Sequence, residues 1–252
     1  MPYEQRVVGF VDILGFGELV RRADREPVLR EEIIRALNTV RSHVWLGGGD
    51  TDLRTQNFSD SLILTACNTA DGFWHLLLSM EALAWNLLQA GVLVRGGVTV
   101  GGVHHDEQIV FGVGVNEAYR LESTVAKMPR IVLGSRAVTA ALIFSAQAEY
   151  AKVYLQARLR RDRDGVWFLN YLTEIGVFNG QDPDGPDMRE HPFFDVGESI
   201  RKIIQDKVDS TLDQPDVYVK VEWLAQYWNR EIAGAHQDGK QPVLGPVILA
   251  GQ

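Results

Sequence analysis

The sequence predicts an α+β fold: a ferredoxin-like βαββαβ core followed by a C-terminal helical extension. Apolar, β-rich segments alternate with amphipathic helical segments in the order strand, helix, strand, strand, helix, strand. A short polar turn separates the second and third strands, as in a β-hairpin. After about residue 180 the composition changes to a loop and two amphipathic helical segments. We therefore expect two parts, residues 1–178 and residues 179–252.

The predicted core can be followed element by element along the chain. Its strands are apolar and rich in β-branched residues, and its helices repeat apolar positions every three or four residues. The hairpin turn is Ser59-Asp60-Ser61, and Asp71 lies in the first turn of the second helix, where a negative charge is favourable. The predicted elements are a strand over 6–14, a helix over 18–46 ended by GGGD, strands over 53–58 and 62–65, a helix from 68 or 69 to 90, and a strand over 92–100.

Further elements follow the core in the same alternating pattern. The polar sequence HHDEQ links two short apolar stretches and predicts a second hairpin, and QDPDGPD predicts a loop. The expected elements are a hairpin between Val103 and 109–111, a helix over 116–126, a strand over 130–133, a helix over 136–150, a strand over 166–172, and C-terminal helices over 193–212 and 217–235.

Composition narrows the class of protein. Of 252 residues, 46% are hydrophobic and 23% charged, which is ordinary for a soluble globular protein. The only cysteine, Cys67, excludes an internal disulfide, and neither a signal peptide nor an apolar stretch long enough to span a membrane is evident. We expect a cytoplasmic protein without membrane association. The net charge of -8 argues against nonspecific nucleic-acid binding but leaves nucleoside triphosphates open, since metal ions offset their charge.

Asp12 interrupts the apolar run FVDILGFGEL at the end of the first predicted strand. A carboxylate there is costly to bury unless its charge is compensated. Asp60 lies in the turn of the neighbouring hairpin, so the two carboxylates are expected to converge at one edge of the sheet. Paired carboxylates with nearby carbonyls suit hard divalent cations. The alternative is that Asp12 caps a helix or forms a turn and that Asp60 is an ordinary turn residue.

The segment VFGVGVNEAYRLES, residues 110–123, adds a second polar pair. Asn116 and Arg120 are four residues apart on one helical face, while Ala118 and Leu121 are the core-facing positions. Arginine is suited to phosphate oxygens and to charge that develops on them. Alternatively, Asn116 is a helix cap and Arg120 a solvated residue.

Four ordered motifs, FVDILGF, FSDS, RGGVTVGG and FGVGVNEAYRLES, together resemble the catalytic domain of class III nucleotidyl cyclases. The family pattern is F-x-D-I-x-G-F, a hairpin aspartate, R-x-G-x-x-x-G, and G-x-x-V-N-x-A-x-R-L. The resemblance extends from residue 6 to about 172 and includes PRIVLGSRAV, which is similar to the strand and helix that follow. It implies that the βαββαβ fold is a class III cyclase catalytic core.

The resemblance also implies roles for single residues. Asp12 and Asp60 would bind two divalent cations, Mn²⁺ or Mg²⁺, with the carbonyl of Ile13 as a further ligand. Asn116 would orient the ribose and Arg120 would stabilise the transition state. Phe10 and Arg95 belong to the implied substrate-binding set. The family acts as a head-to-tail homodimer, in which the aspartates of one chain face the asparagine and arginine of the other.

Two positions that select the base depart from the family's purine enzymes. Gln56 stands where adenylate cyclases have lysine and guanylate cyclases glutamate, and Ile109 stands at the partner position. The sequence is most similar to the bacterial Pycsar pyrimidine cyclases. That similarity implies UTP, and less so CTP, as substrate, with a cyclic nucleotide that serves as an antiphage signal and is read by a separate effector. A purine cyclase and an inactive nucleotide-binding module are the alternatives.

Three other features receive plainer interpretations. No lysine clearly matches the family's phosphate-binding lysine; Arg158, Arg160 or Arg161 would replace it, or they form a solvated face. HHDE, residues 104–107, is expected to be a solvated turn in preference to a metal site. GGGD at 47–50 resembles the GGDEF signature but is expected to be a helix-terminating turn.

Overall fold

The computed structural model describes residues 3–42, 49–181, 185, 187–237 and 241–249, and it divides the chain into two compact units, Met1–Asn170 and Tyr171–Gln252. The sequence analysis expected the division after residue 178, whereas the structure divides the chain after Asn170. Tyr171 and Leu172 belong with the second unit because both engage Tyr227: the two tyrosine rings lie 5.3 Å apart, and the Leu172 N–H donates to the Tyr227 hydroxyl at 3.0 Å.

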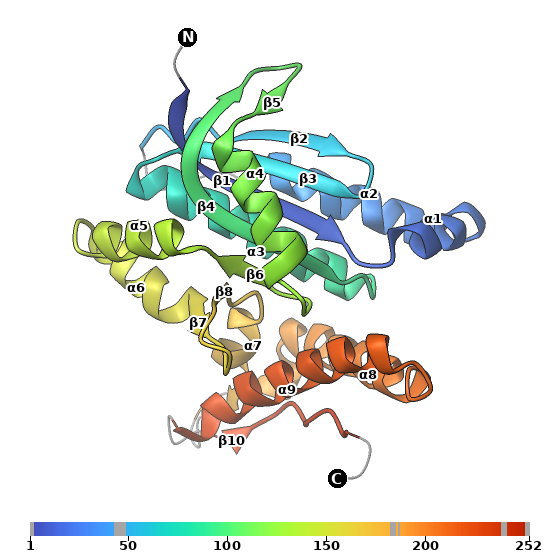
Figure 1. Cartoon of the computed structure of the whole chain (residues 1–252). Coiled ribbons are helices and arrows are strands. Elements are labelled where there is room, and N and C mark those ends of the chain that lie inside the picture. Colours follow the sequence, from blue (N-terminus) through green and yellow to red (C-terminus); the bar gives the residue numbers. More distant parts are fainter. Residues whose placement is uncertain (1–2, 43–48, 182–184, 186, 238–240, 250–252) are drawn as a thin grey trace. The chain divides into compact units, whose positions relative to one another are not determined.

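The first unit is built on a mixed sheet in the order β2-β3-β1-β4-β6-β8-β7, with β5 paired to β4. β1 is central and runs antiparallel to both β3 and β4, whereas β6 runs parallel to β4. The predicted α+β, βαββαβ core is confirmed by β1, α1 with α2, β2, β3, α3 and β4 (Figure 1). The strands are β1 (Glu4–Ile13), β2 (Arg54–Phe58), β3 (Ser61–Cys67), β4 (Val94–His105), β5 (Val110–Phe111), β6 (Ile131–Leu133), β7 (Leu159–Arg161) and β8 (Trp167–Leu169).

Helices cover both faces of this sheet, with α3 behind it and α4 in front (Figure 1). Thr69 caps α3 by accepting a hydrogen bond from the Gly72 N–H, which supports the predicted start of that helix. The helices of the first unit are α1 (Phe16–Arg25), α2 (Pro27–Ser42), α3 (Ala70–Gln89), α4 (Val113–Arg120), the π-helical turn η1 (Leu121–Val125), α5 (Ser135–Ser145) and α6 (Glu149–Arg158).

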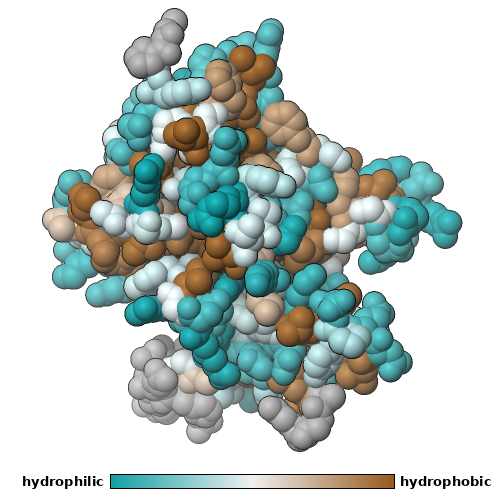
Figure 2. Space-filling view, viewed as in Figure 1, coloured by the Kyte–Doolittle hydropathy of each residue, from teal (hydrophilic) through white to brown (hydrophobic). Residues whose placement is uncertain are grey.

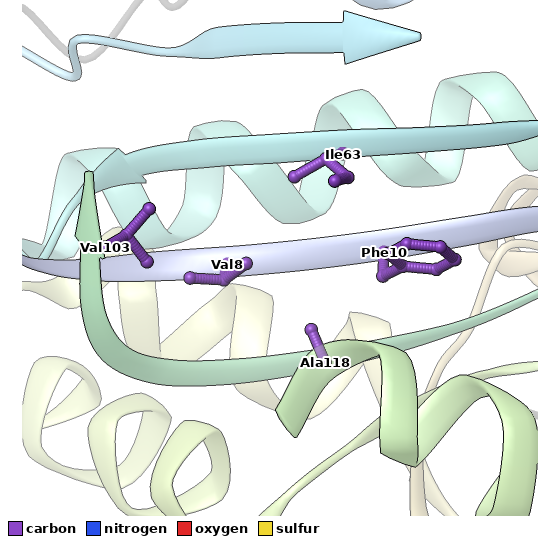
Figure 3. Close-up of a cluster of buried hydrophobic side chains, with 5 residues drawn as sticks. All are labelled: Val8, Phe10, Ile63, Val103 and Ala118. Atoms are coloured by element: carbon purple, nitrogen blue, oxygen red, sulfur yellow. The ribbon is translucent and has the colours of Figure 1, made fainter. Parts of the chain in front are cut away.

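The two faces of β1 pack against different helices because strand side chains alternate. On the α3 face, a Cβ at Gly9 would lie 2.5 Å from Met80 Sδ, so the helix rests directly on the strand. On the α4 face, Val8 and Phe10 form a buried cluster with three residues from other elements (Figure 3), namely Ile63, Val103 and Ala118. Each large apolar side chain buried in this way contributes roughly 1.5–3 kcal/mol. This cluster places α4 over the strand that carries Asp12 near its end.

Two sequence-based boundaries differ from the structure. The helix predicted over 18–46 is two helices, since Pro27 has no N–H to continue α1 and instead begins α2. Its predicted GGGD end lies partly outside the described residues. The helix predicted over 136–150 ends at Ser145, and α6 and β7 follow where the sequence predicted no element.

The second unit contains the two C-terminal helices that the sequence predicts. Their contact buries Ile200 and Ile204 of one helix and Leu224 and Trp228 of the other, and Trp228 Nε1 donates to the Gly245 carbonyl at 3.1 Å. The elements are α7 (Thr173–Phe178), β9 (Gly180–Gln181), the 3₁₀ turn η2 (Met188–Glu190), α8 (Pro192–Ser210), α9 (Pro215–Gln237) and β10 (Gln241–Pro242). None of the helices in the described ranges combines the length and apolar character that crossing a membrane requires.

Candidate active site

Asp12 lies near the end of β1 with a neighbouring strand on each side. It is paired with Ser61 of β3 and with Arg95 of β4. The Arg95 Nε–H donates a hydrogen bond to Asp12 Oδ2 at 3.2 Å, and the aspartate side chain is 18% exposed. The carboxylate that looked unfavourable in the sequence therefore has a direct cationic partner and remains open to solvent.

Asp60 reaches the same place through the β2–β3 hairpin. The turn consists of Ser59 and Asp60, and Ser59 has a φ of +53°, in the left-handed region that residues other than glycine seldom adopt. The Asp60 carbonyl accepts a hydrogen bond from the Ile13 N–H at 3.0 Å, which fixes the turn to the end of β1. The predicted convergence of the hairpin aspartate with the end of the first strand is present in this geometry.

The carboxylates at this edge influence one another electrostatically. Burial raises the pKa of the Asp12 carboxyl above its ordinary value, Arg95 partly reverses that effect, and the negative charge of Asp60 raises the pKa further. The Asp12 pKa is thus raised in spite of the adjacent guanidinium. A carboxylate in this situation gains from any additional positive charge that binds beside it.

Glu122 is a third carboxylate at the site, and the sequence interpretation missed it. It lies in η1, directly after α4, and is only 2% exposed. Its Oε1 is 2.6 Å from Arg95 Nε. Burial raises the pKa of Glu122, Arg95 lowers it, and the charges of Asp12 and Asp60 raise it. A signal was available in the sequence, because Glu122 is four residues after the buried Ala118 and so falls on the core-facing stripe.

The residues at this edge fit a hard divalent cation. Asp12 and Asp60 supply two carboxylates, whereas Glu122 faces Arg95. The described ranges contain no group of three or more His, Cys, Asp or Glu side chains that could hold a metal ion. Mg²⁺ and similar ions are commonly held by one or two protein carboxylates, with phosphate oxygens and waters completing the coordination. Burial and, to a smaller extent, the charge of Asp60 raise the Asp12 pKa, and a bound cation would offset both effects.

Asn116 and Arg120 do not join the carboxylates within one chain. Both side chains are exposed on α4. The Arg120 guanidinium donates two hydrogen bonds of 2.8 Å to Glu117, which lowers the pKa of that glutamate. The Asn116 side chain forms no hydrogen bond with a residue that the structure describes. The predicted helix is present, but its polar pair is exposed and forms no hydrogen bond with the chain's own Asp12.

The two predicted base-selecting residues are neighbours. Gln56 Nε2 donates to the carbonyl of Gln108 at 2.9 Å, immediately before Ile109, whose side chain is 52% exposed. Gln56 Oε1 is buried and accepts no hydrogen bond from the part of the chain that the structure describes. Phe10, by contrast, is covered, and its ring lies 5.4 Å from that of Tyr119.

The remaining candidates have structural partners. Arg158 forms an ion pair with Glu81, Arg160 donates to backbone carbonyls such as Gln156 O at 2.8 Å, and Arg161 Nε donates to Gly165 O at 3.1 Å. The solvated turn predicted over 104–107 is shorter than expected, because His104 and His105 end β4 and His105 is buried. The turn itself follows at Asp106. Asp106 closes it by accepting hydrogen bonds from the Gln108 and Ile109 N–H groups, which lower its pKa to about 2.

No family model and no curated protein matches the sequence. Several solved structures are similar. The guanylyl cyclase domain of the RhoGC fusion protein from the aquatic fungus Blastocladiella emersonii is 15% identical over 67% of this chain and 96% of that chain, with a TM-score of 0.43. The catalytic core of a rhodopsin-guanylyl cyclase with converted specificity, in complex with ATPαS, is 14% identical over 68% and 97%, with a TM-score of 0.44. An adenylate/guanylate cyclase/hydrolase from Silicibacter pomeroyi is 16% identical over 66% and 96%, with a TM-score of 0.39. Likeness at this level does not establish what the present chain does.

Proposed function

We propose that the chain is a metal-dependent pyrimidine nucleotide cyclase that converts UTP, and less readily CTP, to the 3′,5′-cyclic mononucleotide and pyrophosphate. The observation that carries the proposal is the hydrogen bond from the Ile13 N–H to the Asp60 carbonyl, which holds the Asp60 turn at the end of β1, next to Asp12 and its partner Arg95. Asp12 and Asp60 are the carboxylate pair to which the motif resemblance assigns the metal ions. The further motif residues Asn116 and Arg120 are present and accessible.

The chemistry follows from the charges of these groups. Two divalent cations held by Asp12, Asp60 and the Ile13 carbonyl would lower the pKa of the ribose 3′-hydroxyl and offset the charge of the triphosphate. Arg95 keeps its guanidinium at this edge, and only its Nε donates a hydrogen bond to a described residue. Its terminal nitrogens therefore suit phosphate oxygens. Positioning of the 3′-hydroxyl against the α-phosphate supplies most of the remaining rate enhancement.

The proposed active site needs a second copy of the chain. Asn116 and Arg120 lie on the exposed face of α4 and make no contact with Asp12. The same face carries exposed apolar side chains, among them Val113 at 61% and Tyr119 at 54% exposure. Figure 2 shows hydrophobic residues mixed with hydrophilic ones around β5 and α4. A head-to-tail homodimer would cover this surface and bring Asn116 and Arg120 of the partner to the nucleotide.

The argument against purine substrates rests on Gln56 and Ile109, whereas the preference for UTP over CTP rests on the motif resemblance alone. Neither residue matches the lysine or glutamate pairs that distinguish adenine from guanine in class III cyclases. Gln56 Nε2 is occupied by Gln108, which leaves the buried Oε1 as a hydrogen-bond acceptor. The exposed Ile109 offers only apolar contact.

The proposal is tested by incubating the purified protein with Mn²⁺ and each of the four ribonucleoside triphosphates separately. We expect cyclic UMP as the main product, with pyrophosphate in equal amount, detected by mass spectrometry. Asp60→Ala is the matched inactive control, because a turn carboxylate contributes little packing. We expect it to lose at least about 100-fold in rate, the usual effect of removing one electrostatic contributor.

Other results would identify the alternatives. Cyclic AMP or cyclic GMP as the only product would make the protein a purine cyclase, and tight nucleotide binding without turnover would make it a nucleotide-binding module. A dinucleotide product would indicate a nucleotidyl transferase. If cyclic UMP is made, we further propose that it acts as an antiphage signal that a separate cyclic-nucleotide effector detects. The corresponding test is phage resistance of cells that express the wild type but not Asp60→Ala.

A further inference from the structure

Arg95 lies between two carboxylates that compete for the same N–H group. Its Nε–H donates a hydrogen bond to Asp12 Oδ2 at 3.2 Å. Glu122 Oε1 lies closer to the same nitrogen, at 2.6 Å, yet it is buried and accepts no hydrogen bond from a described residue. Nε carries one hydrogen, and that hydrogen is directed toward Asp12. Glu122 Oε1 is therefore an acceptor whose donor is held by another residue.

The position of Glu122 is fixed by the packing of α4 and η1 on the sheet. Gly97 of β4 lies beneath the junction of these two helical segments, where an added Cβ would be 2.4 Å from Ala118 O and 2.9 Å from Glu122 N. The absence of a side chain at Gly97 lets the helix backbone contact the strand. Arg95 lies two residues before Gly97 on the same strand. The π-helical turn then places the Glu122 side chain against Arg95. Single π turns inside helices occur frequently at functional sites.

A bound cation would change which carboxylate holds Arg95. Asp12 oxygens that ligate a cation are no longer available to accept strongly from a guanidinium, and the added positive charge repels Arg95. Glu122 is screened from solvent and its Oε1 already lies 2.6 Å from Nε, so it offers the alternative acceptor. Arg95 could then stay at the sheet edge with its terminal nitrogens toward the triphosphate.

We propose that Glu122 is a positioning residue that retains Arg95 for triphosphate binding when Asp12 is occupied by a metal ion. The inference rests on the proposed function and adds a residue that does not itself touch substrate. The inference predicts that loss of the Glu122 charge weakens triphosphate binding only when Arg95 is present. A purely structural role for Glu122 would lower stability without that dependence.

The test measures binding without turnover, by calorimetry on the full-length chain in Mn²⁺. Inorganic triphosphate is one probe, and 3′-deoxyuridine triphosphate, which lacks the attacking hydroxyl, is the other. We expect Glu122→Gln to weaken binding of both probes by roughly 10- to 100-fold, as loss of an outer-sphere partner usually does. In an Arg95→Gln background, Glu122→Gln should cause no further loss. Thermal unfolding of every variant shows whether it is folded.

Glu81→Gln is the matched control. Glu81 is also a buried glutamate with an arginine partner, Arg158, but it belongs to α3 on the other face of the sheet. The Glu81→Gln substitution should lower stability as Glu122→Gln does, but it should leave triphosphate binding unchanged. If Glu122→Gln does not fold, Glu122→Asp, which keeps the charge on a shorter side chain, is used in the same cycle.

Three results would overturn the inference: Glu122→Gln binds both probes within twofold of the wild type, its effect persists in Arg95→Gln, or Glu81→Gln weakens binding equally. A wild type that binds neither probe would overturn both the inference and the proposed function. If the wild type binds the probes but forms no cyclic nucleotide from any triphosphate, the proposed function alone fails, and the binding cycle still decides the role of Glu122.

Discussion

The fold disfavours the charged form of Asp12. Burial and the charge of Asp60 raise its pKa although Arg95 donates a hydrogen bond to it. A carboxyl group whose pKa is higher in the folded than in the unfolded state lowers stability once it ionises. This cost begins as the pH rises above the ordinary value of 3.8 and is complete above the raised value. Functional sites often retain groups that cost stability in this way.

We therefore predict that Asp12→Asn matches or exceeds the wild type in Tm at pH 7 while it abolishes cyclase activity. The difference in Tm should disappear at pH values below 3.8, where the aspartate is protonated in both states. Thermal unfolding from pH 3 to pH 8 in metal-free buffer measures this difference.

Asp164→Asn is the control, because the pKa of Asp164 is shifted in the opposite direction to that of Asp12. The Asp164 pKa is lowered, chiefly by the hydrogen bond from Arg130, so its stabilising effect is present above pH 3.8 and is lost as the pH falls through the lowered value. Asp164→Asn should therefore unfold at a lower temperature than the wild type at pH 7. A large loss of stability in Asp12→Asn at that pH would contradict our interpretation of the site.

At the scale of elements, the contact between α4 and β4 depends on a glycine. A Cβ at Gly97 would lie 2.4 Å from Ala118 O and 2.6 Å from Leu121 Cβ, and neither position is the flexible end of a side chain. We predict that Gly97→Ala lowers the free energy of unfolding by about 1–3 kcal/mol, the usual cost of overpacking. It should also weaken triphosphate binding, because Glu122 shifts with the helix.

Urea denaturation measures the loss, and Gly17→Ala is the control. Gly17 lies in α1 with no atom within 4 Å of the added Cβ. Gly17 is the second residue of α1, so alanine there should leave stability unchanged or raise it by less than the ~1 kcal/mol expected in a helix interior. Equal destabilisation by both substitutions would show that the close approach at Gly97 is unimportant.

A second interaction between elements concerns the buried His105 at the end of β4. The Arg6 Nε–H donates to the Thr65 hydroxyl at 3.0 Å, and that hydroxyl lies 2.8 Å from His105 Nδ1. A hydroxyl that accepts from Arg6 can donate its own hydrogen to the Nδ1 of a neutral ring, and this arrangement favours the unprotonated histidine. Burial, with the charges of Arg6 and Arg54, lowers the His105 pKa from 6.5 to about 4.

A histidine whose pKa is lowered in the folded state stabilises the fold above its unfolded pKa and loses that effect as the pH falls toward the folded value. We predict that the free energy of unfolding decreases by up to about 3 kcal/mol between pH 6.5 and pH 4 because of His105. The slope over this range should be shallower in His105→Gln than in the wild type. The exposed His104 provides the control, His104→Gln, and urea denaturation at each pH is the measurement. Identical slopes in the wild type and His105→Gln would refute the assignment.

The elements that periodicity and hairpin chemistry specify locally could be predicted from the sequence. These are the βαββαβ core, the Ser59-Asp60 turn and the two C-terminal helices. Pro27 is a local signal for the break between α1 and α2, although the apolar periodicity alone predicts one continuous helix. By contrast, α6 starts after residues 146–148, which contain neither Gly nor Pro, so tertiary packing decides that boundary.

Some residues of the candidate site could likewise be predicted from local patterns, and others depend on tertiary packing. Asp12 and Asp60 could be predicted because strand alternation and hairpin order place them, whereas the pairing of Arg95 with Glu122 depends on how a helix is seated on a strand. The link from Arg6 through Thr65 to His105 joins residues 59 and 40 positions apart, which no local pattern specifies.

At the scale of the whole molecule, the proposed active site is split between two faces of one chain. Asp12 and Asp60 lie at the end of β1, while Arg120 is exposed on α4 and paired with Glu117. In a two-fold symmetric dimer each site would combine the aspartates of one chain with the arginine of its partner. A substitution of an aspartate and a substitution of the arginine can then be placed in different chains of one dimer.

We predict that co-expressed Asp60→Ala and Arg120→Ala chains regain activity that neither variant has alone. Random pairing makes half of the dimers mixed, and each mixed dimer has one intact site of two, so roughly a quarter of the wild-type activity is expected. Co-expressed Asp60→Ala and Asp12→Ala chains are the control, because both defects fall on the same half of every site and no activity should return. The measurement is cyclic nucleotide formed per chain, with the oligomeric state determined by sedimentation on the same samples. An active wild-type monomer, or dimers without restored activity in the first mixture, would place Arg120 outside the shared site. In that case a single chain would have to release Arg120 from Glu117 and bring it to its own Asp12.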